Sequence, residues 1–249
     1  MSDTSKNGRQ TIVDTVIAAP TEVVWRALRD PEKIKTWFGW EAPTLSEEIK
    51  FIFFDSATED FANNTLQFGE WQGAADAIVL EARDDHTRLR VIRAGGPSID
   101  WEGVYDDVIE GWVTFFEQLR LALEVHPGKT RRTIYLSGAS KLGMGEPSGA
   151  LGLSDAIAKA ANEPYAADLA TGDYVAGVIW HKTHFQTGLT VTEWGDGLMV
   201  VSDMGVSPKR PHGGGSALLT TYGLDEDEFD ALQQRWTAWW SDRFEVPTD

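Results

Sequence analysis

The sequence predicts an α+β protein made of two consecutive domains, each an antiparallel sheet closed by one long helix. Three observations predict this organisation. The length of 249 residues fits one large domain or two small ones. Each half contains several short segments rich in β-branched and aromatic residues. Each half also ends in a long amphipathic segment rich in Trp and Phe, at about residues 102–124 and 224–245.

In the first half, the order of elements follows from local signals. Residues 10–17 alternate Thr, Ile and Val, which is typical of a strand. A helix follows from Pro20 or Thr21 to about residue 29, and Glu22 suits its positive N-terminus. It ends at Asp30-Pro31, because the residue before proline avoids helical angles. A second short helix is expected at 32–38, closed by Gly39.

Strands are expected next, and then a long helix. The strand candidates are 49–54, 65–71, 77–83 and 87–93, and the last two are predicted to form a hairpin. The helix at 102–124 carries one apolar face, made of Val108, Trp112, Phe115, Leu119 and Ala122. His126-Pro127-Gly128 ends it, so the predicted domains are 1–127 and 128–249.

The second half repeats this outline with different residues. A helix is expected at 153–161, with Ser154 as its N-cap, and a long helix opens at Leu224-Asp225. The strand candidates are 132–136, 174–180, 184–192, 198–202 and 217–222. The apolar stripe of the last helix is Phe229, Leu232, Trp236, Trp239, Trp240 and Phe244.

Composition limits the partners. The chain has 22 Lys and Arg residues against 39 Asp and Glu residues, a net charge of −17. Such a field repels phosphate backbones, so nucleic acid is not an expected partner. The absence of cysteine excludes disulfides and thiolate chemistry. Residues 1–10 are polar, and no apolar run approaches the roughly 18 residues of a membrane span, so we expect a cytoplasmic protein without a membrane span.

Residues 16–31, VIAAPTEVVWRALRDP, resemble the opening of the SRPBCC, or START-like, superfamily. Within it they are most similar to the branch of the activator of Hsp90 ATPase homologues, whose short Trp-Phe helix is matched by Ile34, Trp37, Phe38 and Gly39. Gly111-Trp112 resembles the last helix of that branch. The resemblance covers about residues 9–125. Pro43-Thr44-Leu45-Ser46 departs from the usual Pro-Gly-Gly segment, and the second half lacks the opening motif.

The resemblance implies a helix-grip fold, in which a curved antiparallel sheet wraps a long C-terminal helix and leaves a cavity between them. The second half is then a divergent copy. A strongly bent sheet and one helix do not pack closely everywhere, which also favours a cavity. Its expected walls in the first half are Trp37, Trp40, Phe51, Phe53, Trp71, Trp112 and Phe116. A filled core without a ligand is the alternative.

Arg93 is the candidate polar group of this cavity. It follows Leu89 and Val91 at a period of two, which places all three on one face of a strand. A buried arginine there can hold a ligand carboxylate with two hydrogen bonds. An exposed strand end is the alternative.

No catalytic, metal-binding or cofactor motif is evident. His181 and His184 are three residues apart, so on a strand they face opposite sides and share no metal. We therefore expect no metal and no cofactor. The predicted function is the binding of a small hydrophobic ligand, and catalytic residues are not assigned. The alternatives are a co-chaperone-like domain that binds a protein partner, and a cyclase or hydrolase that uses the same cavity.

Overall fold

The computed structural model describes residues 9–70, 73–95, 104–208 and 210–245. The chain divides into two compact units, Met1–Lys129 and Thr130–Asp249. This division lies two residues beyond the boundary predicted from the sequence. Each unit is described by itself.

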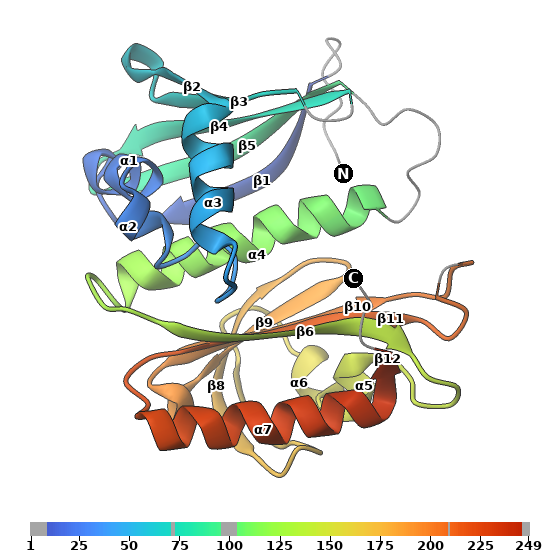
Figure 1. The fold of residues 1–249 in the computed structure, drawn as a ribbon. Helices are drawn as coiled ribbons and strands as arrows, with labels where there is room; N and C mark the ends of the chain where they lie inside the picture. Colours follow the sequence, from blue (N-terminus) through green and yellow to red (C-terminus); the bar gives the residue numbers. More distant parts are fainter. Residues whose placement is uncertain (1–8, 71–72, 96–103, 209, 246–249) are drawn as a thin grey trace. The chain divides into compact units, whose positions relative to one another are not determined.

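The first unit has one five-stranded antiparallel sheet with the strand order β1-β5-β4-β3-β2. Its strands are β1 (Arg9–Ile17), β2 (Ala57–Asp60), β3 (Thr65–Phe68), β4 (Ala74–Arg83) and β5 (His86–Gly95). Its helices are α1 (Thr21–Arg29), α2 (Pro31–Ile34), α3 (Leu45–Lys50) and α4 (Val104–Glu124). Figure 1 shows α4 running along one face of this sheet.

The core of the first unit lies between the sheet and α4. Ile17, Leu66 and Leu89 from the strands and Phe116 and Leu119 from α4 are fully buried in one hydrophobic cluster. Burying one such side chain stabilises a fold by about 1.5–3 kcal/mol. The long helix predicted at the end of the first half is therefore the closing helix of this unit.

Local signals position the starts of the first two helices, although the second, expected at 32–38, is the shorter α2, Pro31–Ile34. The carboxylate of Asp30 accepts a hydrogen bond from the backbone N–H of Glu32 at 3.0 Å, and Pro31 occupies the first turn of α2. Thr87 anchors the entry to α1, because its hydroxyl donates to the carbonyl oxygen of Ala19 at 2.7 Å. The break predicted at Asp30-Pro31 is confirmed.

The strand predicted at 49–54 is wrong. These residues form the end of α3 and a π-helical turn, Phe51–Asp55. Ile49 and Phe53, four residues apart, are buried, whereas Phe51 is 63 % exposed. Phe51 and Phe53, which were both expected in the walls of one cavity, therefore point to different surroundings. β-branched and aromatic residues suit a strand, but here the core selects the helical spacing.

The second unit has a seven-stranded antiparallel sheet with the order β12-β6-β11-β10-β9-β8-β7. Its strands are β6 (Arg132–Ser140), β7 (Pro164–Asp168), β8 (Tyr174–Lys182), β9 (Gln186–Val191), β10 (Gly197–Met204), β11 (Gly214–Thr221) and β12 (Phe244–Glu245). Its helices are α5 (Pro147–Leu151), α6 (Ser154–Ile157) and α7 (Glu226–Arg243).

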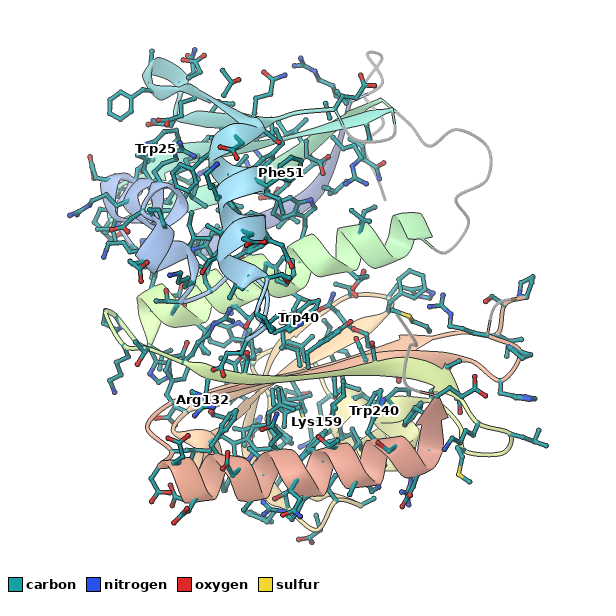
Figure 2. All side chains as sticks on the ribbon, in the orientation of Figure 1. Trp25, Trp40, Phe51, Arg132, Lys159 and Trp240 are labelled. Atoms are coloured by element: carbon teal, nitrogen blue, oxygen red, sulfur yellow. The ribbon has the colours of Figure 1, made fainter. Side chains whose placement is uncertain are left out.

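Helix α7 closes this sheet, and its predicted stripe, Phe229 to Phe244, is buried. Trp240, labelled in Figure 2, donates its indole N–H to the carbonyl oxygen of Ser137 in β6 at 3.2 Å. A reciprocal capping box starts the helix: the Asp225 carboxylate accepts from the Glu228 N–H at 2.9 Å, and the Glu228 carboxylate accepts from the Asp225 N–H at 3.0 Å. The α+β, helix-grip prediction is confirmed in each unit.

Several details of the second half differ from the sequence prediction. The helix expected at 153–161 with Ser154 as its N-cap is the shorter α6, Ser154–Ile157, whose N-cap is Leu153. β7 was not predicted, because its residues PYAAD have low strand propensity. The strand expected at 184–192 starts at Gln186, so His184 lies in the β8–β9 connection. His181 lies on β8, with its Nε2 3.1 Å from Oε1 of Gln186.

Candidate functional site

The side chains on the inner face of β4 and β5 change in size and polarity along the strands. Four directly paired positions share this face, and in order they are Leu80–Leu89, Ile78–Val91, Asp76–Arg93 and Ala74–Gly95. The first two pairs are large, apolar and buried. The last pair is small, with Ala74 only half-buried and Gly95 exposed. The inner face therefore passes from a packed core to an ion pair and then to small residues.

The ion pair between Asp76 and Arg93 is bidentate. Arg93 Nε donates to Asp76 Oδ1 at 2.7 Å, and Arg93 Nη2 donates to Asp76 Oδ2 at 2.6 Å. The two side chains are only 5 % and 12 % exposed, respectively. Both charges are thus largely removed from water, and close fork-like geometry is what makes such a pair tolerable.

Trp112 connects the closing helix to this pair. Its indole N–H donates to Asp76 Oδ2 at 3.0 Å, and its ring stacks against Phe68 of β3 and Phe116 of α4 at centroid distances of 5.4 Å. Asp76 therefore receives three donors from two elements. We call the group Ala74, Asp76, Arg93, Gly95 and Trp112 the open end of the first unit.

Behind the open end, aromatic rings fill the layer between the sheet and α4. Trp37, Phe53 and Phe116 are fully buried. The Trp37 ring lies 5.7 Å from Phe53 in an edge-to-face arrangement and 5.6 Å from Phe116 in a stacked one. Such pairs add about 0.5–1.5 kcal/mol to area burial. In this part of the unit, the predicted cavity walls contact each other and form core.

The predicted site residues therefore separate into groups. Trp37, Phe53 and Phe116 lie in the packed core, and Arg93 and Trp112 lie at the open end. Trp40 is half-buried, with its ring 6.4 Å from that of Phe115. Phe51 points to solvent, and Trp71 lies outside the described residues.

Arg93 lies, as predicted, on the face of Leu89 and Val91, and it is 4 % exposed. Its partner is a carboxylate of the same unit, Asp76. Asp76 is not among the predicted site residues, although its even spacing from Ile78 and Leu80 along the strand places it on the inner face. Its pairing with Arg93 follows only from the hairpin register, which the two-residue turn Asp84-Asp85 sets.

The second unit has a related contact at its surface. Trp236 of α7 donates its indole N–H to Oδ2 of Asp173 at 2.9 Å, and Arg235 Nη2 lies 2.6 Å from Oδ1. Here, however, the Arg235 side chain is 46 % exposed. The inner layer of this unit is filled by buried rings, among them Trp194, Trp236 and Trp240.

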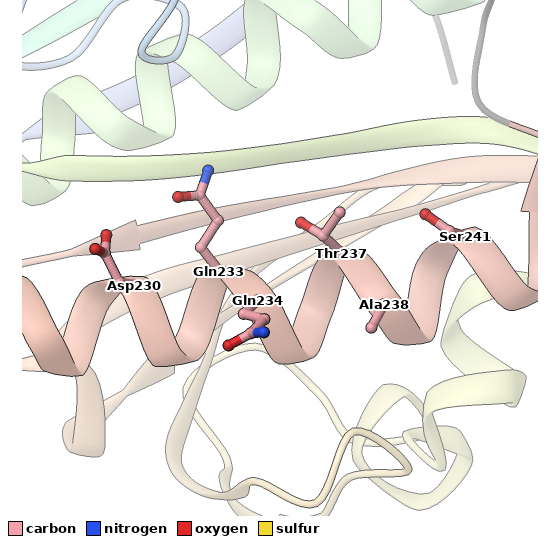
Figure 3. A pocket seen from close by; sticks show the side chains of 6 residues that line it. All are labelled: Asp230, Gln233, Gln234, Thr237, Ala238 and Ser241. Carbon is pink, nitrogen blue, oxygen red and sulfur yellow. The ribbon is translucent and has the colours of Figure 1, made fainter.

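The outer face of α7 carries a shallow depression, which Figure 3 shows from close by. It is lined by Asp230, Gln233, Gln234, Thr237, Ala238 and Ser241. All six residues belong to this one helix, and no second element encloses the depression among the residues that line it. It is a solvated helix face.

Titratable groups outside the open end have structural explanations. Burial raises the pKa of Tyr165, whose hydroxyl donates to the carbonyl oxygen of Thr190 at 2.8 Å. Burial likewise raises the pKa of Tyr222 to about 12, against a smaller lowering by Arg131. The hydrogen bond from Arg88 lowers the pKa of Asp14. Both tyrosines therefore stay protonated at neutral pH, which excludes them as bases.

Within the described ranges, no three His, Asp or Glu side chains group so as to hold a metal ion. The described helices include none that is both long and apolar enough to cross a membrane.

No protein-family model matches the chain, and no curated protein matches it. Several solved structures are similar to it. The Aha1 dimer from Colwellia psychrerythraea is 18 % identical, with a TM-score of 0.35, over 47 % of this chain and 96 % of that one. The di-domain ARO/CYC BexL from the BE-7585A biosynthetic pathway is 10 % identical, with a TM-score of 0.36, over 96 % and 99 %.

DynU16, a protein of the dynemicin biosynthetic locus, is 16 % identical, with a TM-score of 0.30, over 94 % of each chain. These likenesses are too distant to transfer a ligand or an activity to this chain.

Proposed function

We propose that the first unit binds a small, largely hydrophobic molecule at its open end. The observation that carries this proposal is the gradient along β4 and β5. Large buried pairs give way to Asp76–Arg93 and then to Ala74–Gly95, which has the smallest side chains of the four pairs. Binding sites typically combine an apolar wall with a few well-placed polar groups.

The walls of the proposed site have both components. Phe68, 8 % exposed, and Trp112, half-buried, supply apolar surface beside the ion pair. The packed cluster of Trp37, Phe53 and Phe116 forms a rigid floor, since each ring is held by neighbouring rings. In the second unit the paired inner-face positions of β10 and β11 run from Met199–Leu219 and Val201–Ala217 to Asp203–Gly215. There the Asp203 carboxylate accepts a hydrogen bond from the backbone N–H of Ser148 in α5 at 3.0 Å, so a second element covers it.

The alternative of a cyclase or hydrolase gains no support at the open end. Its charged inner-face residues, Asp76 and Arg93, are hydrogen-bonded to each other.

The alternative of a protein-binding domain is favoured by one observation: Phe51 and Phe61 are 63 % and 72 % exposed on the first unit. Replacing both by serine tests that alternative, because loss of a stoichiometric protein partner, with ligand binding unchanged, would support it.

The first test of ligand binding is native mass spectrometry of freshly purified protein, followed by denaturation of the same sample. A discrete extra mass that is released on denaturation is the expected result. Binding of the neutral fluorophore N-phenyl-1-naphthylamine then gives a titratable signal. We expect saturable binding with a stoichiometry of one per chain.

A pair of variants locates the site. Ala74→Phe places a ring on the inner face of β4 at the open end and should abolish binding of the fluorophore. Ala75→Phe places the same ring on the opposite face of the same strand, because successive strand residues alternate. It should bind the fluorophore as the wild type does. Equal binding by both folded variants would contradict a site at the open end.

A further inference from the structure

Building on the proposed site, we infer that its ligand is uncharged and presents a hydroxyl group to Oδ1 of Asp76. The inference concerns the class of ligand and rests on the balance of charge and hydrogen bonds at the open end. It revises the role that the sequence suggested for Arg93, which was to hold a ligand carboxylate.

The charges at the open end disfavour an ionic ligand. On the inner faces of β4 and β5, Asp76 and Arg93 are the charged residues, and they neutralise each other across 2.6 and 2.7 Å. An anionic ligand that entered here would be repelled by the Asp76 carboxylate, which is the more exposed partner of the pair. A cationic ligand would meet a carboxylate already committed to a guanidinium. In either case the ligand charge loses water without gaining a matched partner, which is costly.

The Asp76 carboxylate has an acceptor site that is not used within the described residues. A carboxylate offers about four lone-pair sites, two on each oxygen. Oδ2 of Asp76 accepts from Arg93 Nη2 and from Trp112 Nε1, so its sites are used. Oδ1 accepts from Arg93 Nε, and the described residues supply no second donor to it. One acceptor site on a largely buried carboxylate is therefore available for a ligand donor.

The Asp76 carboxylate is accessible to solvent. The Asp76 side chain is 12 % exposed, against 5 % for Arg93, so the carboxylate is the part of the pair that solvent reaches. The adjoining inner-face positions toward the strand ends are Ala74, which carries a methyl group, and Gly95, which has no side chain. A hydroxyl donor makes a short, charge-assisted bond to such an oxygen.

Three probes that share one ring system test the inference at pH 7. Naphthalene, 2-naphthol and 2-naphthoate differ only in bearing no polar group, a neutral hydroxyl or a carboxylate. Each is titrated against the N-phenyl-1-naphthylamine complex of the full chain. We expect 2-naphthol to bind about tenfold more tightly than naphthalene, since a hydrogen bond to a charged group is involved. We expect 2-naphthoate to bind most weakly.

Two variants separate charge from shape. Asp76→Asn keeps the size of the side chain and removes its negative charge, so the ion pair with Arg93 is lost and the site becomes more positive. The order should then reverse, with 2-naphthoate tighter than 2-naphthol. Trp112→Phe removes one donor and no charge, so it should preserve the wild-type order. Circular dichroism reports whether each variant is folded. If Asp76→Asn does not fold, the affinities of the three probes for the wild type and for Trp112→Phe decide whether the ligand is a neutral hydroxyl donor.

The outcomes are distinguishable. Wild-type binding of 2-naphthoate that equals or exceeds that of 2-naphthol would overturn the inference and leave the proposed binding function intact. Equal binding of 2-naphthol and naphthalene would remove Oδ1 of Asp76 as the acceptor. If neither the fluorophore nor any of the three probes binds, the proposed function itself fails.

Discussion

The indole N–H of Trp112 donates to Oδ2 of Asp76 at 3.0 Å and so joins the closing helix of the first unit to the sheet beneath it. The second unit makes the same kind of contact between Trp236 and Asp173 at 2.9 Å. In both cases the tryptophan ring packs between helix and sheet, and its indole N–H donates a hydrogen bond to an aspartate carboxylate. The two contacts differ in how exposed the arginine is that pairs with the same carboxylate.

This difference predicts unequal costs for removing the two carboxylates. Asp76→Ala leaves the Arg93 guanidinium, 5 % exposed, without its carboxylate, and loss of one partner of a buried pair costs about 3–5 kcal/mol. Asp173→Ala costs less, about 1–3 kcal/mol, because Arg235 can turn to solvent and the groups that lose their acceptor, the Trp236 N–H and the Thr171 hydroxyl, are uncharged. Urea unfolding, followed separately for each unit, measures both.

Asp14→Ala serves as the control for that comparison. Asp14 pairs with Arg88 at 2.6 Å, but their side chains are 42 % and 32 % exposed, so solvent screens the pair. Its removal should shift the urea midpoint far less than Asp76→Ala does. A larger shift for Asp14→Ala would argue against Asp76–Arg93 as the dominant ion pair of the first unit.

Phe51 and Phe53 are predicted to differ sharply in their effect on stability. Phe53 is fully buried among Trp37, Phe38 and Phe68, so Phe53→Ala should cost about 3–5 kcal/mol of unfolding free energy. Phe51 is 63 % exposed, and Phe51→Ala should stay within about 0.5 kcal/mol of the wild type. Chemical denaturation measures both changes. Equal losses of unfolding free energy would instead favour the strand predicted at 49–54 over the π-helical turn.

Tyr222 predicts a loss of stability in alkali. Burial raises the pKa of its hydroxyl from 10.0 to about 12 in the folded state. The folded chain therefore holds this proton more tightly than the unfolded chain does, and stability falls as pH rises from about 10 to about 12. The unfolding free energy measured across this window should decrease less steeply in Tyr222→Phe. The remaining slope belongs to other groups, including Tyr165, whose pKa burial also raises.

An unchanged slope in Tyr222→Phe would mean that this hydroxyl ionises equally in the folded and unfolded chains. Difference absorbance of tyrosinate provides the direct measurement. In the wild type, part of the tyrosinate signal should appear only as the pH approaches about 12, and Tyr222→Phe should lose this part.

Much of the fold is determined by patterns local in the sequence. The alternation in β4 and β5, the spacing of Trp and Phe in α4 and α7, and the Asp30-Pro31 break each fix a dihedral preference or a buried face within a few residues. They were sufficient to predict two sheets, each closed by a helix. Arg93 was placed on the inner face for the same reason, since parity along a strand needs no tertiary information.

The tertiary structure decided what local patterns leave open. The segment FIFFD has the composition of a strand, and only the burial of Ile49 and Phe53 one turn apart selects a helical path. The partner of Arg93 depends on the register between two strands, which brings Asp76 opposite it from 17 residues away. Burial and register are properties of the packed chain, so they decide which aromatic residues become core and which ion pair faces the open end.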